Sequence, residues 1–289
     1  MNILDAVNLT PLMKISSGRT ETIVGLIDGF VAKNHPDLIS DNIHDISGHL
    51  SDQCVPENAT TYTHGTFITG VLCGKRSSIA PAICPNCTLL VRPIFTKMVT
   101  ENGQPLSAKP EELAAAIVEC IEAGASVLNL SLAVTQVLLQ EQRELEEALN
   151  YAARRGAIIV AAAGNQSNLS SSVITRHPGV IPVVACDLQG RPIGLSNLGS
   201  SIGKRGLLAP GENVISLGTN GKPLTLSGTS IATPFVTGAI ALLWSEFPTA
   251  TVTEIKLAIT QAYGSRRKTV VPPLLDVWGA YQTMLKTQS

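Results

Sequence analysis

One stretch of the chain decides how the rest is interpreted: Leu226-Ser227-Gly228-Thr229-Ser230-Ile231-Ala232-Thr233-Pro234. It places a serine hydroxyl after a Gly-Thr turn and before an apolar segment, residues 235–247, that is expected to be a helix. Helix N-termini carry unpaired N–H groups and a partial positive charge, and both favour an anion that forms beside the serine. Pro234 is expected in the first turn, where a missing donor costs little. The stretch therefore fits an activated nucleophile, and taken alone it also fits a serine that caps a buried helix.

Two other segments supply the groups that would activate such a serine. The first is a continuous apolar run, Thr22-Ile23-Val24-Gly25-Leu26-Ile27-Asp28, which is typical of a parallel strand buried on both faces. Asp28 closes this strand at its carboxyl end, the edge where ligands gather in open α/β sheets. The second predicts a helix with His64 at its beginning, facing a cleft: His64-Gly65-Thr66-Phe67-Ile68-Thr69-Gly70. Alone, the aspartate also fits a turn and the histidine a structural role.

The order of the three residues along the chain is Asp28, His64, Ser230. This order separates subtilisin from chymotrypsin and from the α/β-hydrolases, which reach the same geometry with other orders. The three segments resemble the corresponding blocks of the subtilisin-like serine proteases, the subtilases. A fourth block resembles the family strand whose asparagine side chain donates to the oxyanion: Ile158-Ile159-Val160-Ala161-Ala162-Ala163-Gly164-Asn165. On these blocks the chain is identified as a member of that family from about residue 22 to its end.

The resemblance implies a serine endopeptidase that works through an acyl-enzyme. Ser230 would attack the peptide carbonyl, His64 would carry the proton, and Asp28 would orient the imidazole. The side chain of Asn165 and the backbone N–H of Ser230 would form the oxyanion hole. Two wall segments of the family pattern would contact the substrate through Ser131, Leu132, Ala133, Ala163 and Gly164.

The chain departs from the family pattern beside two of these residues. Asp28 is followed by Gly29 and Phe30 where the family usually has Ser or Thr and then Gly, so a hydroxyl near the carboxylate is missing. Phe67 stands where a second histidine is usual, and Thr69 replaces an alanine. None of these changes removes a catalytic atom, so an active enzyme is expected. The alternative is a non-catalytic pseudoprotease that binds peptides without turnover.

Strand and helix patterns alternate along the chain, which predicts an α/β fold: a doubly wound, mainly parallel sheet with helices on both faces. The expected strands cover residues 22–28, 88–93, 127–132, 158–163 and 180–185. The expected helices cover residues 66–73, 111–123, 140–155 and 235–247. We expect residues 1–21 to be an N-terminal lead-in segment without a prodomain and residues 22–289 to be one subtilisin-like catalytic domain.

The composition limits the classes of molecule that are expected as partners. The 21 basic and 22 acidic residues give a net charge of −1, so neither a nucleic acid nor a membrane is an expected partner. A peptide or precursor-peptide substrate is expected instead. No segment approaches the ~20 apolar residues of a transmembrane helix, and the N-terminus lacks the basic-then-apolar pattern of a secretory signal. Only 27 residues precede Asp28, too few for the folded prodomain of secreted subtilases. A cytoplasmic protein is therefore expected.

Six cysteines leave a choice between thiols and a bridge. Without a secretory signal we expect reduced thiols, with a local bridge around Cys54 or Cys87 as the alternative; the other four are Cys73, Cys84, Cys120 and Cys186. Cys84 and Cys87 have the spacing of a zinc or redox pair but no matching second pair. No metal and no cofactor are expected, because residues 74–81, where the family often has a calcium loop, include no acidic residue.

Within the family, the chain is most similar to the leader-cleaving protease of cyanobactin-type modified-peptide pathways. The similarity lies in Asp28-Gly29, in Ile79-Ala80-Pro81 with Arg92-Pro93-Ile94-Phe95, and in Leu208-Ala209-Pro210-Gly211-Glu212. It implies cleavage of the leader from a ribosomally made precursor peptide; the alternative is a general intracellular subtilase. Macrocyclising relatives carry an added helical cap between the aspartate and the histidine. The interval from Asp28 to His64 is short, so hydrolysis to a linear product is expected.

Overall fold

The computed structural model describes residues 2–46, 60–94, 109–132, 139–260 and 268–288. Within these ranges a parallel sheet has the strand order β2-β3-β1-β4-β5-β6-β7, and a separate antiparallel hairpin joins β8 to β9. The strands of the sheet are β1 Ile23–Asp28, β2 Ile43–Asp45, β3 Thr88–Pro93, β4 Val127–Leu130, β5 Ile158–Ala162, β6 Val180–Cys186 and β7 Leu207–Pro210. The hairpin strands are β8 Val214–Leu217 and β9 Pro223–Leu226. The predicted α/β class is confirmed.

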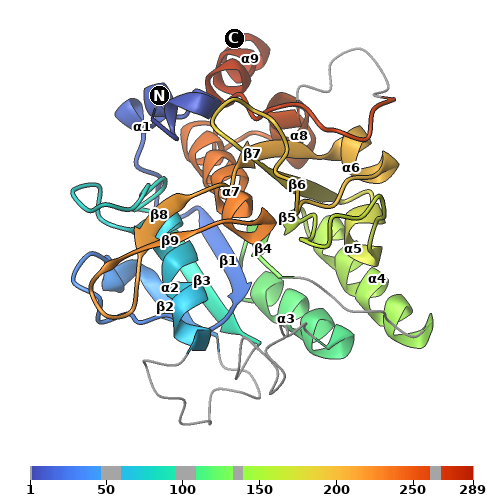
Figure 1. Cartoon of the computed structure of the whole chain (residues 1–289), viewed down its shortest axis with the longest axis horizontal. Helices are drawn as coiled ribbons and strands as arrows, with labels where there is room; N and C mark the ends of the chain where they lie inside the picture. The colour runs from blue at the N-terminus through green and yellow to red at the C-terminus, as the bar shows by residue number, and fades with distance from the viewer. Residues whose placement is uncertain (1, 47–59, 95–108, 133–138, 261–267, 289) are drawn as a thin grey trace.

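Helices cover both faces of the sheet. The side chains of the strands divide mainly between two large core clusters, and a third, smaller cluster lies at β6 and β7. On β4, Val127 packs in the core shared with α2 and α7, whereas Leu128 packs against α3 and α4. Figure 1 shows α3 and α4 together on one side of the strands, away from α2 and α7. Because both faces are buried, the strands carry the continuous apolar runs seen in the sequence. The α-helices are α1 Thr10–Ile15, α2 Thr60–Cys73, α3 Pro110–Glu122, α4 Leu139–Arg154, α5 Val173–Arg176, α6 Ser200–Arg205, α7 Thr229–Glu246, α8 Val252–Thr260 and α9 Val277–Gln288, and the short 3₁₀ turns are η1 Asp5–Val7 and η2 Ser40–Asn42.

The segment before β1 adds to the largest core cluster. Leu9 and Leu12 are fully buried there together with residues of α7 and α9. The amide of Asn8 donates to Asp276 Oδ1 at 3.1 Å, which joins the N-terminal turn to the residue just before α9. Figure 1 accordingly shows the two ends of the chain near each other.

Two helices begin earlier than the sequence predicts. α7 starts at Thr229, directly after Gly228 with its φ of 146°, so Pro234 lies inside the helix and its expected place in the first turn is wrong. α2 starts at Thr60, which puts His64 in its second turn and not at its beginning. Its early residues are poor helix formers, but Tyr62 stacks on Phe30 with ring centroids 5.2 Å apart. Packing thus extends the helix beyond the point that local preference predicts.

Arg92 is a fully buried cation that ties β3 to α3. Its Nε donates to Glu119 at 2.5 Å, one Nη donates to Glu112 at 2.8 Å, and the other donates to the Pro93 carbonyl at 2.5 Å. The guanidinium is 0% exposed, whereas the two glutamate side chains are 21% and 33% exposed. Each of the three guanidinium nitrogens of the buried cation therefore faces an oxygen, at the strand next to β1.

Replacing this cation should destabilise the protein. Arg92→Met leaves two neighbouring carboxylates without their shared partner, although water still reaches both. We expect the free energy of unfolding to fall by about 2–3 kcal/mol, measured by urea denaturation at neutral pH. Arg191→Met is the matched control, because Arg191 is 73% exposed in its pair with Asp187 and should cost no more than about 0.5 kcal/mol. Equal losses in the two variants would contradict the assignment.

The cysteines that the structure describes are free and buried: Cys73, Cys84, Cys87, Cys120 and Cys186. Burial raises the pKa of Cys120 and of Cys186 to about 12, so both thiols are protonated at neutral pH. These five agree with the expected thiols, whereas Cys54 lies outside the described residues. In the same described ranges no helix has the length and apolar character needed to cross a bilayer, and no group of three or more His, Cys, Asp or Glu side chains is arranged to hold a metal ion.

Candidate active site

Asp28 and His64 meet because α2 packs closely on the chain that leaves β1. Asp28 is the last residue of β1, as predicted. The residues that follow it, Gly29 and Phe30, pass close to α2. A Cβ atom on Gly65 would lie 2.3 Å from the Phe30 carbonyl and 2.8 Å from the Gly29 carbonyl. Only glycine permits this approach, since real side chains never come so near to backbone oxygen. The glycine after the histidine therefore sets the distance between helix and strand.

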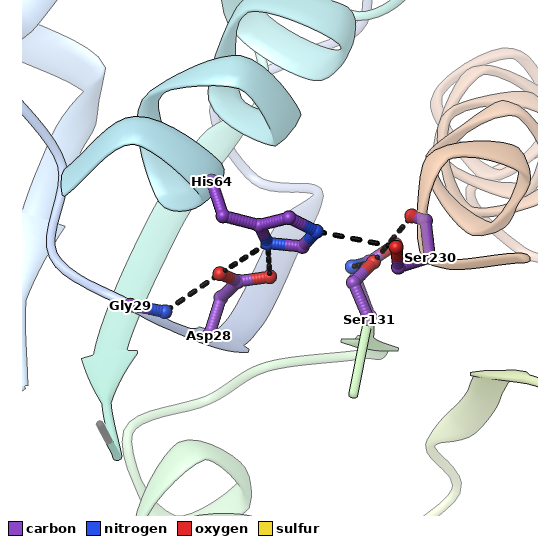
Figure 2. Close-up of polar contacts among 6 residues, drawn as sticks. Asp28, Gly29, His64, Ser131 and Ser230 are labelled. Atoms are coloured by element: carbon purple, nitrogen blue, oxygen red, sulfur yellow. Dashed lines mark hydrogen bonds and ion pairs between the residues drawn. The ribbon is translucent and has the colours of Figure 1, made fainter. Parts of the chain in front are cut away.

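The carboxylate of Asp28 holds the imidazole in one orientation. His64 Nδ1 lies 2.7 Å from one oxygen of Asp28 and 3.0 Å from the other (Figure 2). The N–H of Gly29 donates to the nearer oxygen at 2.6 Å, so this carboxylate has a backbone donor beside it although the usual neighbouring hydroxyl is missing. An ionised carboxylate only accepts, so the proton sits on Nδ1 and leaves Nε2 as an acceptor.

Ser230 completes the row on the other side of the ring. Its Oγ lies 3.2 Å from His64 Nε2, within hydrogen-bond reach of the free acceptor (Figure 2). The Asp28 side chain is 1% exposed and that of His64 is 16% exposed, so the carboxylate is sealed and the imidazole opens to solvent at one edge. The three residues that the sequence singled out are thus adjacent and in the order that proton transfer requires.

The surroundings of His64 favour its protonated imidazole more than water does. Burial of His64 lowers its pKa, but the charge of Asp28 and the hydrogen bond to it together raise the pKa by more. The net result is a pKa above the ordinary value of about 6.5. The carboxylate therefore stabilises the imidazolium that forms when the ring accepts a proton.

Asn165 contacts Thr229, the residue before Ser230, and its amide is held in one orientation. Its Oδ1 accepts from the Thr229 N–H and from the Thr229 hydroxyl, each at 2.9 Å. Since the oxygen is occupied, the two N–H donors of the amide point away from Thr229, and the residue is exposed. The N–H of Ser230 lies in the first turn of α7, where donors lack intrahelical acceptors. These are the two donors that the sequence predicts for an oxyanion hole.

A residue that the sequence did not single out fixes the loop carrying Asn165. Asn197 Oδ1 accepts from the N–H groups of Gln166 and Asn168 at 3.0 and 3.1 Å. Its amide donates to the Ala163 carbonyl at 3.2 Å, and its own N–H donates to the Gly164 carbonyl at 2.8 Å. Asn197 is 8% exposed and lies about thirty residues further along the chain. Its amide also donates to the Gln166 side-chain oxygen at 2.6 Å. No local pattern marks Asn197, since all of these partners lie in another segment of the chain.

The residues expected to contact substrate lie at the ends of two neighbouring strands. Ser131 and Leu132 follow β4, and Ala163 and Gly164 follow β5, which pairs with β4. The strands end at Leu130 and Ala162, earlier than predicted, so all four residues stand beyond the sheet edge. Ser131 Oγ donates to the Ser230 carbonyl at 2.9 Å. Ala133 lies outside the described residues.

Comparisons with known proteins show the family of the chain. A sequence model of the subtilase family, Peptidase_S8, matches residues 19–276. The thermostable alkaline protease of Halalkalibacterium halodurans is 31% identical over 239 residues, which is 82% of this chain and 61% of that protein. The thermophilic serine proteinase of Bacillus sp. strain AK1 is 30% identical over 236 residues, 80% of this chain and 54% of that protein. The chain thus matches little more than half the length of these two relatives.

Solved structures give the same result over nearly the whole chain. The prenylagaramide maturation protease PagA has a TM-score of 0.80 at 26% identity, covering 96% of this chain and 98% of that one. The patellamide maturation protease PatA has a TM-score of 0.75 at 29% identity, covering 93% and 98%. With the family pattern present from residue 19 to residue 276 on a matching fold, the chain belongs to the subtilase family of serine peptidases.

Proposed function

We propose that Asp28, His64 and Ser230 are the catalytic triad of a serine endopeptidase. The observation that carries this proposal is the unbroken row from the Asp28 carboxylate through His64 to the Ser230 hydroxyl, with contacts of 2.7 and 3.2 Å. A serine hydroxyl is a weak nucleophile until a base accepts its proton. The row supplies that base, and it supplies a buried carboxylate that keeps the base in the required tautomer.

In the proposed mechanism, each step of peptide hydrolysis is assigned to one of these groups. Ser230 Oγ attacks the scissile carbonyl carbon while its proton moves to His64 Nε2, and the carbonyl oxygen becomes an oxyanion. The Asn165 amide and the Ser230 N–H donate to that oxygen. His64 then gives its proton to the leaving amine, and an acyl-enzyme remains. Water enters, loses a proton to His64, and releases the acid with Ser230 restored.

The proposed substrate is a ribosomally made precursor peptide from which the chain removes the leader. Support comes from the likeness to two structures named as maturation proteases, each nearly fully covered. Support also comes from the buried residues beside the nucleophile, Ser131, Leu132, Ala163 and Gly164, which would form the walls along an extended peptide. We propose hydrolysis as the outcome, since the interval from Asp28 to His64 is too short for the helical cap that macrocyclising relatives carry there.

Mass spectrometry of two substrates tests the proposal. The enzyme is incubated with a cyanobactin-type precursor that carries leader and core, and in parallel with denatured casein. A single cut between leader and core, giving linear fragments, supports leader removal. Cleavage of casein at many sites identifies a general subtilase, and a cyclic core product contradicts hydrolysis. Peptide binding by calorimetry without any product identifies a non-catalytic peptide-binding protein and rejects the triad.

The pH profile follows from the pKa of His64. Only the neutral imidazole accepts the Ser230 proton, so kcat/KM should fall as pH drops through the pKa of the free enzyme. Because Asp28 raises that pKa, the midpoint of the acid limb should lie above pH 6.5. The measurement is kcat/KM from pH 5 to 9, with circular dichroism at each pH to exclude unfolding. A flat profile, or a midpoint below 6.5, would count against His64 as the base.

A further inference from the structure

A proline inside α7 leaves the backbone carbonyl of the nucleophile without its usual helical partner. In an α-helix the carbonyl of residue 230 accepts from the N–H of residue 234, but Pro234 has no N–H. An unpaired carbonyl in a buried first turn is unfavourable and tends to distort the helix there. The group that donates a hydrogen bond to this carbonyl therefore helps to determine the position of Ser230.

The partner of that carbonyl is a side chain from another element. Ser131 Oγ donates to the Ser230 carbonyl at 2.9 Å, reaching it from the end of β4 (Figure 2). Ser131 is 5% exposed. Its oxygen in turn accepts from the amide of Asn129 at 2.7 Å. The single hydroxyl hydrogen is thus used within the protein, and no donor is left for a substrate.

The row of hydrogen bonds continues back into α7. Asn129 Oδ1 accepts from the Thr237 hydroxyl at 2.8 Å, and Asn129 and Thr237 are both fully buried. Thr237 lies about two turns after Ser230 on the same helix. The hydrogen bonds therefore run from Thr237 of α7 through Asn129 and Ser131 back to the backbone carbonyl of Ser230. Buried polar groups joined in this way restrict each other's positions more than separate pairs do.

We propose that Ser131 is a positioning residue for the nucleophile, acting through the Ser230 carbonyl that Pro234 leaves free. This role rests on the proposed function of Ser230 and differs from the substrate-wall role that the sequence assigned to Ser131. The hydrogen bond from Ser131 holds the first turn of α7 at the end of β4. The Ser230 hydroxyl then stays within reach of His64 Nε2, and the Ser230 N–H stays beside Asn165.

Reaction with diisopropyl fluorophosphate separates the two roles, because this small reagent does not occupy the peptide groove. In that reaction Ser230 Oγ forms a bond to phosphorus, fluoride leaves, and His64 takes the hydroxyl proton. Ser131→Ala should slow the phosphorylation rate constant about tenfold to a hundredfold, while KM for a peptide substrate changes less than threefold. A loss confined to substrate contacts would leave the phosphorylation rate unchanged and would raise KM.

Ser126→Ala is the matched control. Ser126 lies at the other end of β4 and also donates its hydroxyl to a backbone carbonyl, that of Ile23 at 3.1 Å, so its loss should slow labelling less than twofold. Ser131→Cys keeps the side-chain shape with a weak donor and should also slow labelling, even if the alanine variant does not fold. Labelling of either Ser131 variant at the wild-type rate would overturn the inference alone. Absence of labelling in the wild type would reject the proposed function and this inference with it.

Discussion

Replacing Ser230 by alanine should lower kcat for peptide hydrolysis by about 10⁶-fold, the loss seen when the nucleophile of subtilisin is removed. Without Oγ no acyl-enzyme forms, and the remaining donors can only assist direct attack by water. The fold should survive, because the Ser230 side chain is only half-buried and its hydroxyl bonds to His64 at the end of the row. The backbone carbonyl that Ser131 contacts is unchanged in this variant.

Steady-state kinetics on a fluorogenic peptide and mass spectrometry of long incubations measure this loss. Ser227→Ala is the matched control: it makes the same substitution three residues earlier, at an exposed serine whose oxygen accepts from the Asn213 N–H. Its kcat should stay within threefold of wild type. Turnover by Ser230→Ala above one hundredth of the wild-type rate would show that another group is the nucleophile.

The sequence was enough to predict the groups that carry the proposed chemistry, because Asp28 and Ser230 stand at the ends of elements with a clear pattern. Asp28 ends an apolar strand, and Ser230 is the second residue of an apolar helix that begins directly after Gly228. Strands buried on both faces give long apolar runs, so the alternation of strand and helix was also visible. The fold class and the family follow from such local signals.

The supporting contacts were not predictable in the same way. Asn197 bonds to backbone groups about thirty residues earlier in the chain, and Ser131 bonds to a carbonyl about a hundred residues later. Pro234 lies inside α7, and the Ser230 carbonyl that it leaves free accepts from Ser131, which follows β4. Local preference alone therefore could not place the start of the helix. One signal was present: Asn129 is a polar side chain in the middle of the apolar run that forms β4, and a buried amide requires partners.

Asn165→Ala should lower kcat by about 10²–10³-fold with little change in KM, as the loss of one oxyanion donor does in subtilisin. The reason is that the amide contacts the carbonyl oxygen weakly in the bound substrate and strongly once that oxygen carries negative charge. The structure prepares the amide for this: Thr229 occupies the side-chain oxygen with two hydrogen bonds, and the donor end is left facing outward.

The Asn165→Asp variant distinguishes the loss of the amide donor from the loss of the contacts that hold the surrounding structure. An aspartate keeps the acceptor for the Thr229 N–H and hydroxyl, so the first turn of α7 should stay in place, but it offers no donor and adds a negative charge beside the oxyanion. Its kcat should therefore fall at least as far as that of Asn165→Ala. Asn168→Ala, an exposed asparagine of the same loop, is the control and should stay within threefold. A rise in KM with kcat unchanged in the Asn165 variants would make this residue a substrate contact, since only a group that acts on the developing charge lowers the rate of the chemical step.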